Sequence, residues 1–239
     1  MVLLKCDLHV HTDASRDGES SVEAVLAAAA AAGLDAVAIT DHDTTEGSIS
    51  ALAAHHPGVL VIPGIEVSTK QGHLLVLGTT QVLAPKRDVL ETIAEAKTLG
   101  AVTIVPHPFH RWRHGVGLRC KEALQAADAI EALNSRYIIG TANQKAARMA
   151  KKYGRPATAG SDAHNCKFIG FGVTEIDAEE RSVAAILDAI RAGHVSCSCR
   201  KTPLRTYTRQ SWDNTVRKMR RRVPRFRHRP RRRIIHRKK

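Results

Sequence analysis

Histidines and carboxylates recur in short clusters along the chain, and each cluster follows an apolar run. His9 and His11 form an H-x-H pair, Asp162 and His164 form a D-x-H pair, and Glu66 lies between them in the sequence. Side chains alternate in direction along an extended segment, so both members of a pair point to the same side and can reach one ion. Buried ionisable groups are costly unless they are paired or bound to metal, so these clusters predict a metal site. Imidazole and carboxylate ligands suit Zn, Mn or Fe.

The elements that must position these side chains alternate between short β-rich runs and helical runs. The expected strands cover residues 3–8, 36–40, 59–63, 74–77, 102–105, 129–133, 157–160 and 172–176. The expected helices cover residues 21–32, 46–55, 86–99, 121–127, 140–153 and 182–192. This order predicts a mainly parallel α/β sheet, open or closed into a barrel, with helices outside.

Other chemistry-bearing residues also fall at the ends of the expected strands. Asp41 and His42 follow the second strand, His107 follows the fifth, and Asn134 and Arg136 follow the sixth. In parallel α/β folds the loops at the carboxyl ends of the strands converge on one face. We therefore expect these residues and the first clusters to share one rim of the sheet.

Six segments together resemble the polymerase and histidinol phosphatase (PHP) family of phosphoesterases. They are D-L-H-V-H-T at 7–12, I-T-D-H-D at 39–43, P-G-I-E-V-S at 63–68, G-H-L-L-V-L-G at 72–78, P-H-P at 106–108 and G-S-D-A-H at 160–164. The resemblance extends from residue 7 to about residue 172. It implies a distorted, TIM-like, seven-stranded (β/α) barrel with two or three divalent ions, Mn, Zn or Fe, at its carboxyl end.

The resemblance also implies three sets of metal ligands. His9, His11, Glu66 and Asp162 would hold one ion; Glu66, His73 and His107 a second; and Asp17, His42 and His164 a third. Asp13 competes with Asp17, because the family places its acid directly after a serine and this chain has an extra residue there. His73 precedes its expected strand, so it is a ligand on the resemblance alone.

The ligand sets predict a hydrolytic mechanism. Closely spaced divalent ions would activate a bridging water as hydroxide, in line with the phosphorus, and would neutralise the phosphoryl oxygens. Arg136 is the expected phosphate clamp, because a guanidinium group can bind two oxygens, and Arg111, Arg119 and Lys167 are alternatives. We expect Asp41 to orient a ligand or to shuttle a proton.

Three functions compete at this stage. The first is hydrolysis of a phosphomonoester, such as a nucleotide or a small-metabolite phosphate. The second is exonucleolytic cleavage of RNA or DNA. The third is a nucleic-acid-binding scaffold without catalysis, and the apparently complete ligand set argues against it.

Positive charge is concentrated at the carboxyl end of the chain. The formal net charge of the 239 residues is +14, yet residues 200–239 hold 18 of the 37 Lys and Arg and one of the 23 acids. We expect a catalytic domain at residues 1–199, which is mildly acidic, and a basic, disordered tail at residues 200–239. The tail could bind RNA, DNA or another polyanion, contact an anionic membrane, or carry solvated charge without a specific partner.

Cysteine spacing and hydropathy bear on the compartment. Five cysteines at irregular spacing argue against a disulfide framework, and the C-x-C of Cys197 and Cys199 is typical of ordinary packing or a terminal strand. No apolar stretch approaches the ~18 residues of a transmembrane helix. The first residues lack the basic start and apolar middle of a signal peptide. A cytoplasmic protein is therefore expected.

Overall fold

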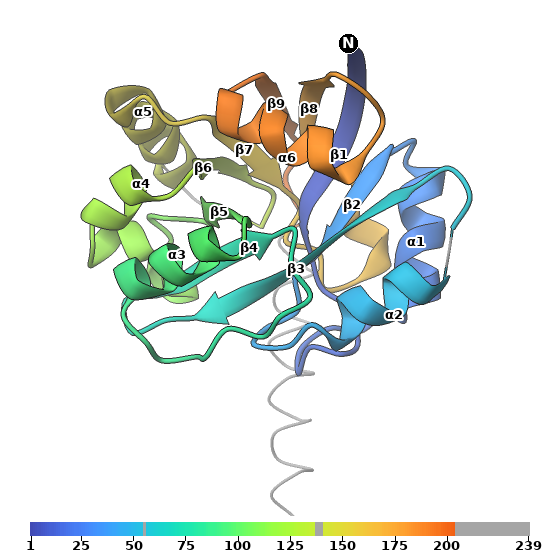
Figure 1. Ribbon diagram of the computed structural model, residues 1–239, viewed down its shortest axis with the longest axis horizontal. Helices are drawn as coiled ribbons and strands as arrows, with labels where there is room; N and C mark the ends of the chain where they lie inside the picture. Colours follow the sequence, from blue (N-terminus) through green and yellow to red (C-terminus); the bar gives the residue numbers. More distant parts are fainter. Residues whose placement is uncertain (55, 137–140, 204–239) are drawn as a thin grey trace, which may run out of the picture. The chain divides into compact units, whose positions relative to one another are not determined.

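A single mixed sheet forms the centre of the fold in the computed structural model, which describes residues 1–54, 56–136 and 141–203 (Figure 1). The strands of these residues are β1 (Val2–Val10), β2 (Ala36–Ile39), β3 (Leu60–Ser68), β4 (His73–Leu77), β5 (Val102–Val105), β6 (Ala129–Asn134), β7 (Ala157–Gly160), β8 (Gly172–Ala178) and β9 (Val195–Cys199). Their order across the sheet is β7-β6-β5-β4-β3-β2-β1-β8-β9. They belong to one compact unit, Met1–Thr202.

The expectation of seven strands is wrong for the described residues, which contain nine. The expected strand at residues 172–176 is β8, and β9 is not among the expected strands; both extend the sheet beyond β1 in antiparallel pairings. Cys197 and Cys199 lie in β9, so the terminal-strand interpretation of C-x-C is confirmed. The boundary between residues 199 and 200 stays a prediction, and residues 204–239 of the expected tail lie outside the described residues.

The described helices follow the expected pattern closely. They are α1 (Val22–Ala31), α2 (Glu46–Ala54), α3 (Val89–Thr98), α4 (Glu122–Ala126), α5 (Ala142–Tyr153) and α6 (Val183–Ala192), with short 3-10 helices η1 (Arg111–Arg113), η2 (Val116–Leu118) and η3 (Cys166–Phe168). Polar side chains begin several of them: the Ser21 hydroxyl accepts a hydrogen bond from the Ala24 amide, and Ser182 does the same for Ala185. No described helix is long and apolar enough to span a membrane.

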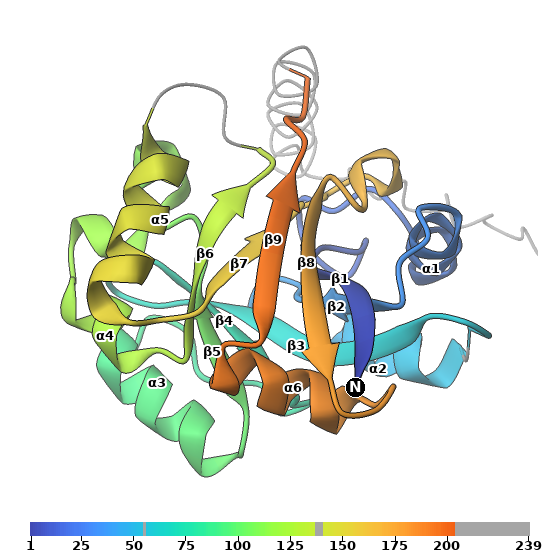
Figure 2. The same cartoon turned by 90° about the horizontal axis from the view of Figure 1, so that it is seen from above.

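The sheet curls until β7 approaches β1, which makes the barrel nearly closed (Figure 2). The Asp7 carboxylate joins the two sides: its Oδ1 accepts from the Ser161 amide at 3.0 Å, and its Oδ2 accepts from the Gly170 amide at 2.9 Å. The Asp162 amide donates to the His9 carbonyl at 2.8 Å. These bonds bring the ends of β1 and β7 to the same rim.

Apolar side chains fill the barrel and leave one end of it polar. Leu8, Ile62, Leu75 and Ile104 are buried in one cluster together with side chains of α6, which pack at the other end of the barrel. Two further apolar clusters lie between the sheet and the outer helices. The rim formed by the ends of β1, β2, β5, β6 and β7 is where the buried polar side chains gather.

The strand β4 runs antiparallel to both β3 and β5, and this changes the position of two expected ligands. Glu66 lies inside β3, opposite Leu75, and does not follow the strand. His73 is the first residue of β4, opposite Ser68. An antiparallel strand begins where its neighbours end, so His73 reaches the rim from its amino end.

Candidate metal centre

The end of β1 carries the first two histidines into the buried rim. His9 is fully buried and His11 is 1% exposed. The two rings lie 5.2 Å apart between their centroids, so both face one space, as the H-x-H spacing predicts. His9 Nε2 is 3.2 Å from Glu66 Oε2, and His11 Nε2 is 3.1 Å from the same oxygen.

Glu66 is the centre of the cluster. Its Oε2 faces His9, His11 and His42, whose Nδ1 is 3.3 Å away, and its Oε1 lies 2.8 Å from His73 Nδ1 and 3.2 Å from His107 Nε2. Burial alone would raise the pKa of Glu66, but the imidazoles of His42, His73 and His9 hold it well below its usual range. Five imidazoles exceed the roughly four lone-pair positions of one carboxylate, so direct hydrogen bonds do not account for the arrangement.

Asp162 and His164 reach the same cluster from the loop after β7. Asp162 Oδ1 lies 3.8 Å from His9 Nε2 and 3.7 Å from His11 Nε2. Asp162 has a φ of 53° and His107 a φ of 32°, which residues with side chains rarely adopt. Strained backbone of this kind persists where the surroundings fix it, and it clusters at functional sites.

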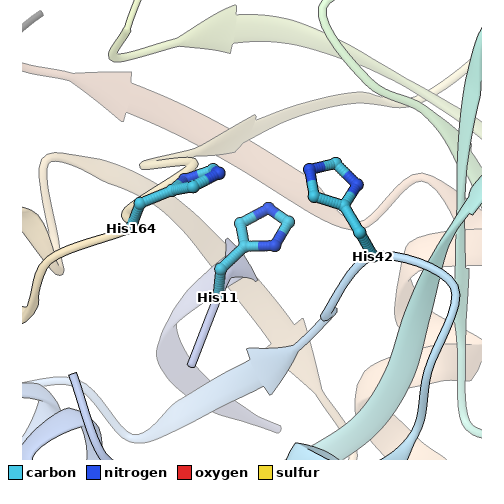
Figure 3. Close-up of side chains that lie close together, drawn as sticks. All are labelled: His11, His42 and His164. Atoms are coloured by element: carbon cyan, nitrogen blue, oxygen red, sulfur yellow. The ribbon is translucent and has the colours of Figure 1, made fainter. Parts of the chain in front are cut away.

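A second group of histidines forms the outer part of the centre. The ring centroids of His42 and His164 lie 4.6 Å and 4.1 Å from that of His11, and Figure 3 shows the three rings around a common space. Asp17 Oδ2 is 3.3 Å from His164 Nε2 and 3.9 Å from His42 Nε2. Asp13 is exposed. The geometry therefore favours Asp17 over Asp13 as the acid of this group.

The hydrogen-bond network around His11 fits a bound cation. The Ser15 hydroxyl donates to Asp41 Oδ1 at 2.7 Å, so it can only accept from His11 Nδ1, which is 3.2 Å away. His11 Nε2 then faces the carboxylates of Glu66 and Asp162, at 3.1 Å and 3.7 Å, without a hydrogen-bond partner, and in the neutral ring this nitrogen carries the lone pair. A lone pair facing two carboxylates is unfavourable unless a positive charge lies between them.

Other atoms of the cluster also fit divalent ions. Asp17 Oδ1 and His107 Nδ1 are buried without a hydrogen-bond partner. Burial and the Arg136 guanidinium hold the pKa of His164 well below its usual range, so its ring is neutral and can donate a lone pair. Four sets of described residues bring ligand atoms close enough for one ion: His9, His11 and Glu66; His9, His107 and Asp162; His42, Glu66 and His73; and His11, His42 and His164.

Asp41 supports the cluster from behind. It is fully buried, and its two oxygens accept from the Thr12 amide at 2.7 Å and from the Thr12 and Ser15 hydroxyls, also at 2.7 Å. Ser15 in turn contacts His11 and accepts from the His42 amide. The structure thus connects Asp41 to the histidines through Ser15, which favours orientation of a ligand over proton transfer.

Glu131 is a functional candidate that the sequence interpretation missed. Its Oε1 is 3.0 Å from His9 Nδ1, while its Oε2 accepts from the His107 amide at 2.7 Å and from Asn134 Nδ2 at 2.8 Å. The side chain is 1% exposed, in the middle of β6. An acid inside the apolar sequence A-I-E-A-L-N was the available signal.

Two arginines border the centre. Arg136 Nη1 lies 2.7 Å from His164 Nδ1 and 3.5 Å from Asp162 Oδ1. Arg113, in η1, pairs with Asp162 through both Nη atoms, with Nη2 at 3.1 Å from Oδ1. The sequence interpretation named Arg136 but not Arg113, because nothing placed η1 over the rim. The alternatives Arg111, Arg119 and Lys167 are exposed.

Comparison with known proteins agrees with this geometry. A family model described as "PHP domain" matches residues 7–100, and one described as "PHP-associated" matches residues 140–195. The chain is 30% identical over 151 residues to an uncharacterized protein of Methanocaldococcus jannaschii, covering 59% of this chain and 87% of the relative. It is 42% identical over 82 residues to phosphoribosyl 1,2-cyclic phosphate 1,2-diphosphodiesterase of Eggerthella lenta, covering 31% of each.

Solved structures share the fold at low sequence identity. A two-domain protein of Bacteroides vulgatus that contains a predicted PHP-like metal-dependent phosphoesterase superposes with a TM-score of 0.72 at 20% identity, covering 89% of this chain and 70% of the other. Endonuclease Q in complex with a 27-mer duplex that has an abasic lesion at the active site superposes with a TM-score of 0.68 at 17% identity, covering 88% and 67%. These likenesses show the fold.

Proposed function

The chain belongs to the PHP family, and on this premise we propose that it is a metal-dependent phosphoesterase whose active site is the cluster around Glu66. The observation that carries the proposal is the buried His11 Nε2, which lies 3.1 Å from Glu66 Oε2 and 3.7 Å from Asp162 Oδ1 without a hydrogen-bond partner. Divalent ions at such a centre lower the pKa of bound water and neutralise charge on phosphoryl oxygens.

We assign the ligands in three groups, of which the first two share Glu66. His9, His11, Glu66 and Asp162 would hold one ion; Glu66, His73 and His107 a second; and Asp17, His42 and His164 a third. Two or three ions, Mn, Zn or Fe, fit these imidazole and carboxylate ligands.

The remaining polar residues orient the ligands and the substrate. Glu131 accepts from His9 Nδ1, which directs His9 Nε2 toward Glu66, and Ser15 directs His11 Nε2 in the same way. Arg136 and Arg113 each place a guanidinium group at the edge of the centre, where a phosphoryl group would accept two hydrogen bonds. Both arginines are partly exposed, at 14% and 18% of the side chain, so a substrate can reach them.

The proposed substrate is a phosphomonoester such as a nucleotide or a small-metabolite phosphate. Two guanidinium groups beside one metal centre suit the dianionic end of such a molecule. A phosphodiester of RNA or DNA is the second candidate, and it is supported by the basic surface of α5 beside the centre and by the endonuclease among proteins of the same fold.

The proposal is tested with the full chain. Metal content is measured after purification, and activity is then assayed with Mn²⁺ on nucleoside monophosphates, other phosphomonoesters and a short single-stranded RNA. Release of inorganic phosphate indicates a phosphatase, and shortened RNA indicates a nuclease.

The variant His11→Ala is expected to lose both bound metal and activity, because it removes the lone pair between the two carboxylates. His194→Ala is the matched control, since His194 is exposed and its recorded hydrogen bonds involve only its backbone. A folded His11→Ala protein with parental metal content and turnover would refute the site.

A further inference from the structure

The outer face of α5 is strongly basic. Lys145, Arg148, Lys151 and Lys152 are exposed on it, and Arg155 follows just after its end. The sequence between residues 135 and 161 contains no acid. Among the described residues, the Lys and Arg side chains that form ion pairs with carboxylates lie elsewhere in the domain. Within that part of the chain, none of these five cations has a carboxylate partner.

The spacing of these cations does not stabilise the helix itself. Arg148 and Lys152 are four residues apart within α5, and like charges at this spacing destabilise a helix. The composition of the domain does not explain the clustering, because acids outnumber Lys and Arg over residues 1–199. The charge is therefore local to α5.

The basic face begins beside the metal centre. Asn143, in the first turn of α5, donates to the Asn134 carbonyl at 3.2 Å, and Asn134 Nδ2 lies 3.2 Å from Asp162 Oδ2. Lys145 Nζ is 4.3 Å from the centre of the Phe109 ring, two residues after His107. Figure 2 shows α5 on the outside of the barrel, alongside β6 and β7.

We propose that the outer face of α5 binds the sugar-phosphate backbone of a single-stranded nucleic acid and leads it to the metal centre. Lys145, Arg148 and Lys152 follow the i, i+3, i+7 spacing of one helical stripe. At 1.5 Å per residue the stripe is about 10 Å long, the length of about three stacked nucleotides at ~3.4 Å each. The inference rests on the proposed function with its second substrate candidate, a phosphodiester of RNA or DNA, because the metal centre supplies the hydrolysis.

A single strand fits the site better than a duplex does. Glu66 and Asp162 are 1% and 0% exposed, so the reacting phosphate must enter a buried position. The end of a single strand is narrower than a duplex and can separate from the helix surface there. Binding through phosphate contacts releases counterions, so it has a characteristic salt dependence.

The test compares two triple variants of the full chain. The first is Lys145→Gln, Arg148→Gln and Lys152→Gln. The matched control replaces three exposed cations at the other end of the barrel, Lys5, Lys97 and Arg191, with Gln and removes the same charge. Both retain residues 203–239, so any binding by that segment is common to the two proteins.

Affinity for a labelled 12-nucleotide single-stranded DNA is measured in EDTA at several salt concentrations, which separates binding from hydrolysis. Loss of three contacts should lower the slope of log K against log salt by about 2, and the affinity at ~0.1 M salt by about tenfold or more. The control should match the parent. Equal slopes and affinities in the two variants would overturn the inference.

A second measurement needs no variant. Photo-crosslinking of a 4-thiothymidine oligonucleotide to the parent protein, followed by peptide mapping, should label residues 142–155. Crosslinks confined to residues beyond 203 would contradict the proposal. If the parent binds the strand through α5 but hydrolyses no phosphoester with Mn²⁺, the proposed function fails while the binding surface stands.

Discussion

Replacing Glu131 with glutamine should weaken metal binding while the fold survives. Glu131 accepts from His9 Nδ1 at 3.0 Å, from the His107 amide at 2.7 Å and from Asn134 Nδ2 at 2.8 Å. An amide side chain has one oxygen and one NH₂ group, so it cannot accept from both His9 and His107. If the amide oxygen of the Glu131→Gln side chain accepts from the His107 amide, its NH₂ group faces the N–H of His9 Nδ1. His9 then loses the hydrogen bond that orients its ring.

The expected magnitude follows from the partners of Glu131. Loss of a group that orients metal-bound histidines costs about 10- to 100-fold in metal affinity. At about 1.4 kcal/mol per tenfold this corresponds to ~1.4–2.8 kcal/mol. Because the change acts on His9, excess metal should restore most of the turnover.

The assay is a titration of the metal-free protein with Mn²⁺ by calorimetry, with phosphoester hydrolysis measured across the same metal range. Glu175→Gln is the control, because Glu175 lies in β8 opposite Lys5, four residues before His9, and accepts from the exposed Ser196 hydroxyl at 3.3 Å. Unchanged Mn²⁺ affinity in a folded Glu131→Gln protein would refute the assignment of Glu131 as the positioning residue for His9.

Three further predictions concern the same centre. Asp17→Asn should lower the number of bound ions measured by elemental analysis, because Asp17 contacts His164. Asp13→Asn should leave that number unchanged, because Asp13 is exposed. The opposite result would make Asp13 the ligand. Arg113→Ala should raise the inhibition constant of inorganic phosphate by about tenfold or more, because a hydrogen bond to a charged group contributes ~1.5–3 kcal/mol. Arg111 is an exposed neighbour in η1, and Arg111→Ala should leave this constant unchanged. Mn²⁺ at about 100 times its dissociation constant should stabilise the protein by ~2.7 kcal/mol, which a thermal melt with and without EDTA measures; equal melting temperatures would contradict a metal centre in the native state.

The position of most of the candidate site could be predicted, because the residues of parallel strands obey a simple rule. His9, His42, His107 and Asp162 each follow or end a parallel strand, so one rim was expected for all of them. The rule does not apply to His73, since β4 is antiparallel and its first residue reaches the rim. Nothing in the short L-L-V-L run distinguishes a parallel strand from an antiparallel one.

Glu131 and Arg113 show the two limits of the sequence interpretation. Glu131 lies inside β6, and the apolar sequence around it does not show whether its side chain points into the barrel or toward the outer helices. Arg113 depends on a 3-10 helix whose path over Asp162 is a tertiary contact between residues far apart in the sequence. The count of seven strands came from the resemblance, and β9 was expected only as one interpretation of the C-x-C pair, because the short V-S-C-S-C sequence has few apolar residues.

The bonds from Asp7 to the amides of Ser161 and Gly170 set the order in which the metal centre can be assembled during synthesis. A growing chain that ends before Ser161 contains His9, His11 and Glu66 but lacks Asp162, His164 and the partners of Asp7. Contacts across such a sequence separation form late, because the closure of a long loop must come first. The ribosome has therefore completed most of the domain before the full set of ligands can meet, and a nascent fragment that lacks Asp162 and His164 should bind metal weakly and with altered stoichiometry.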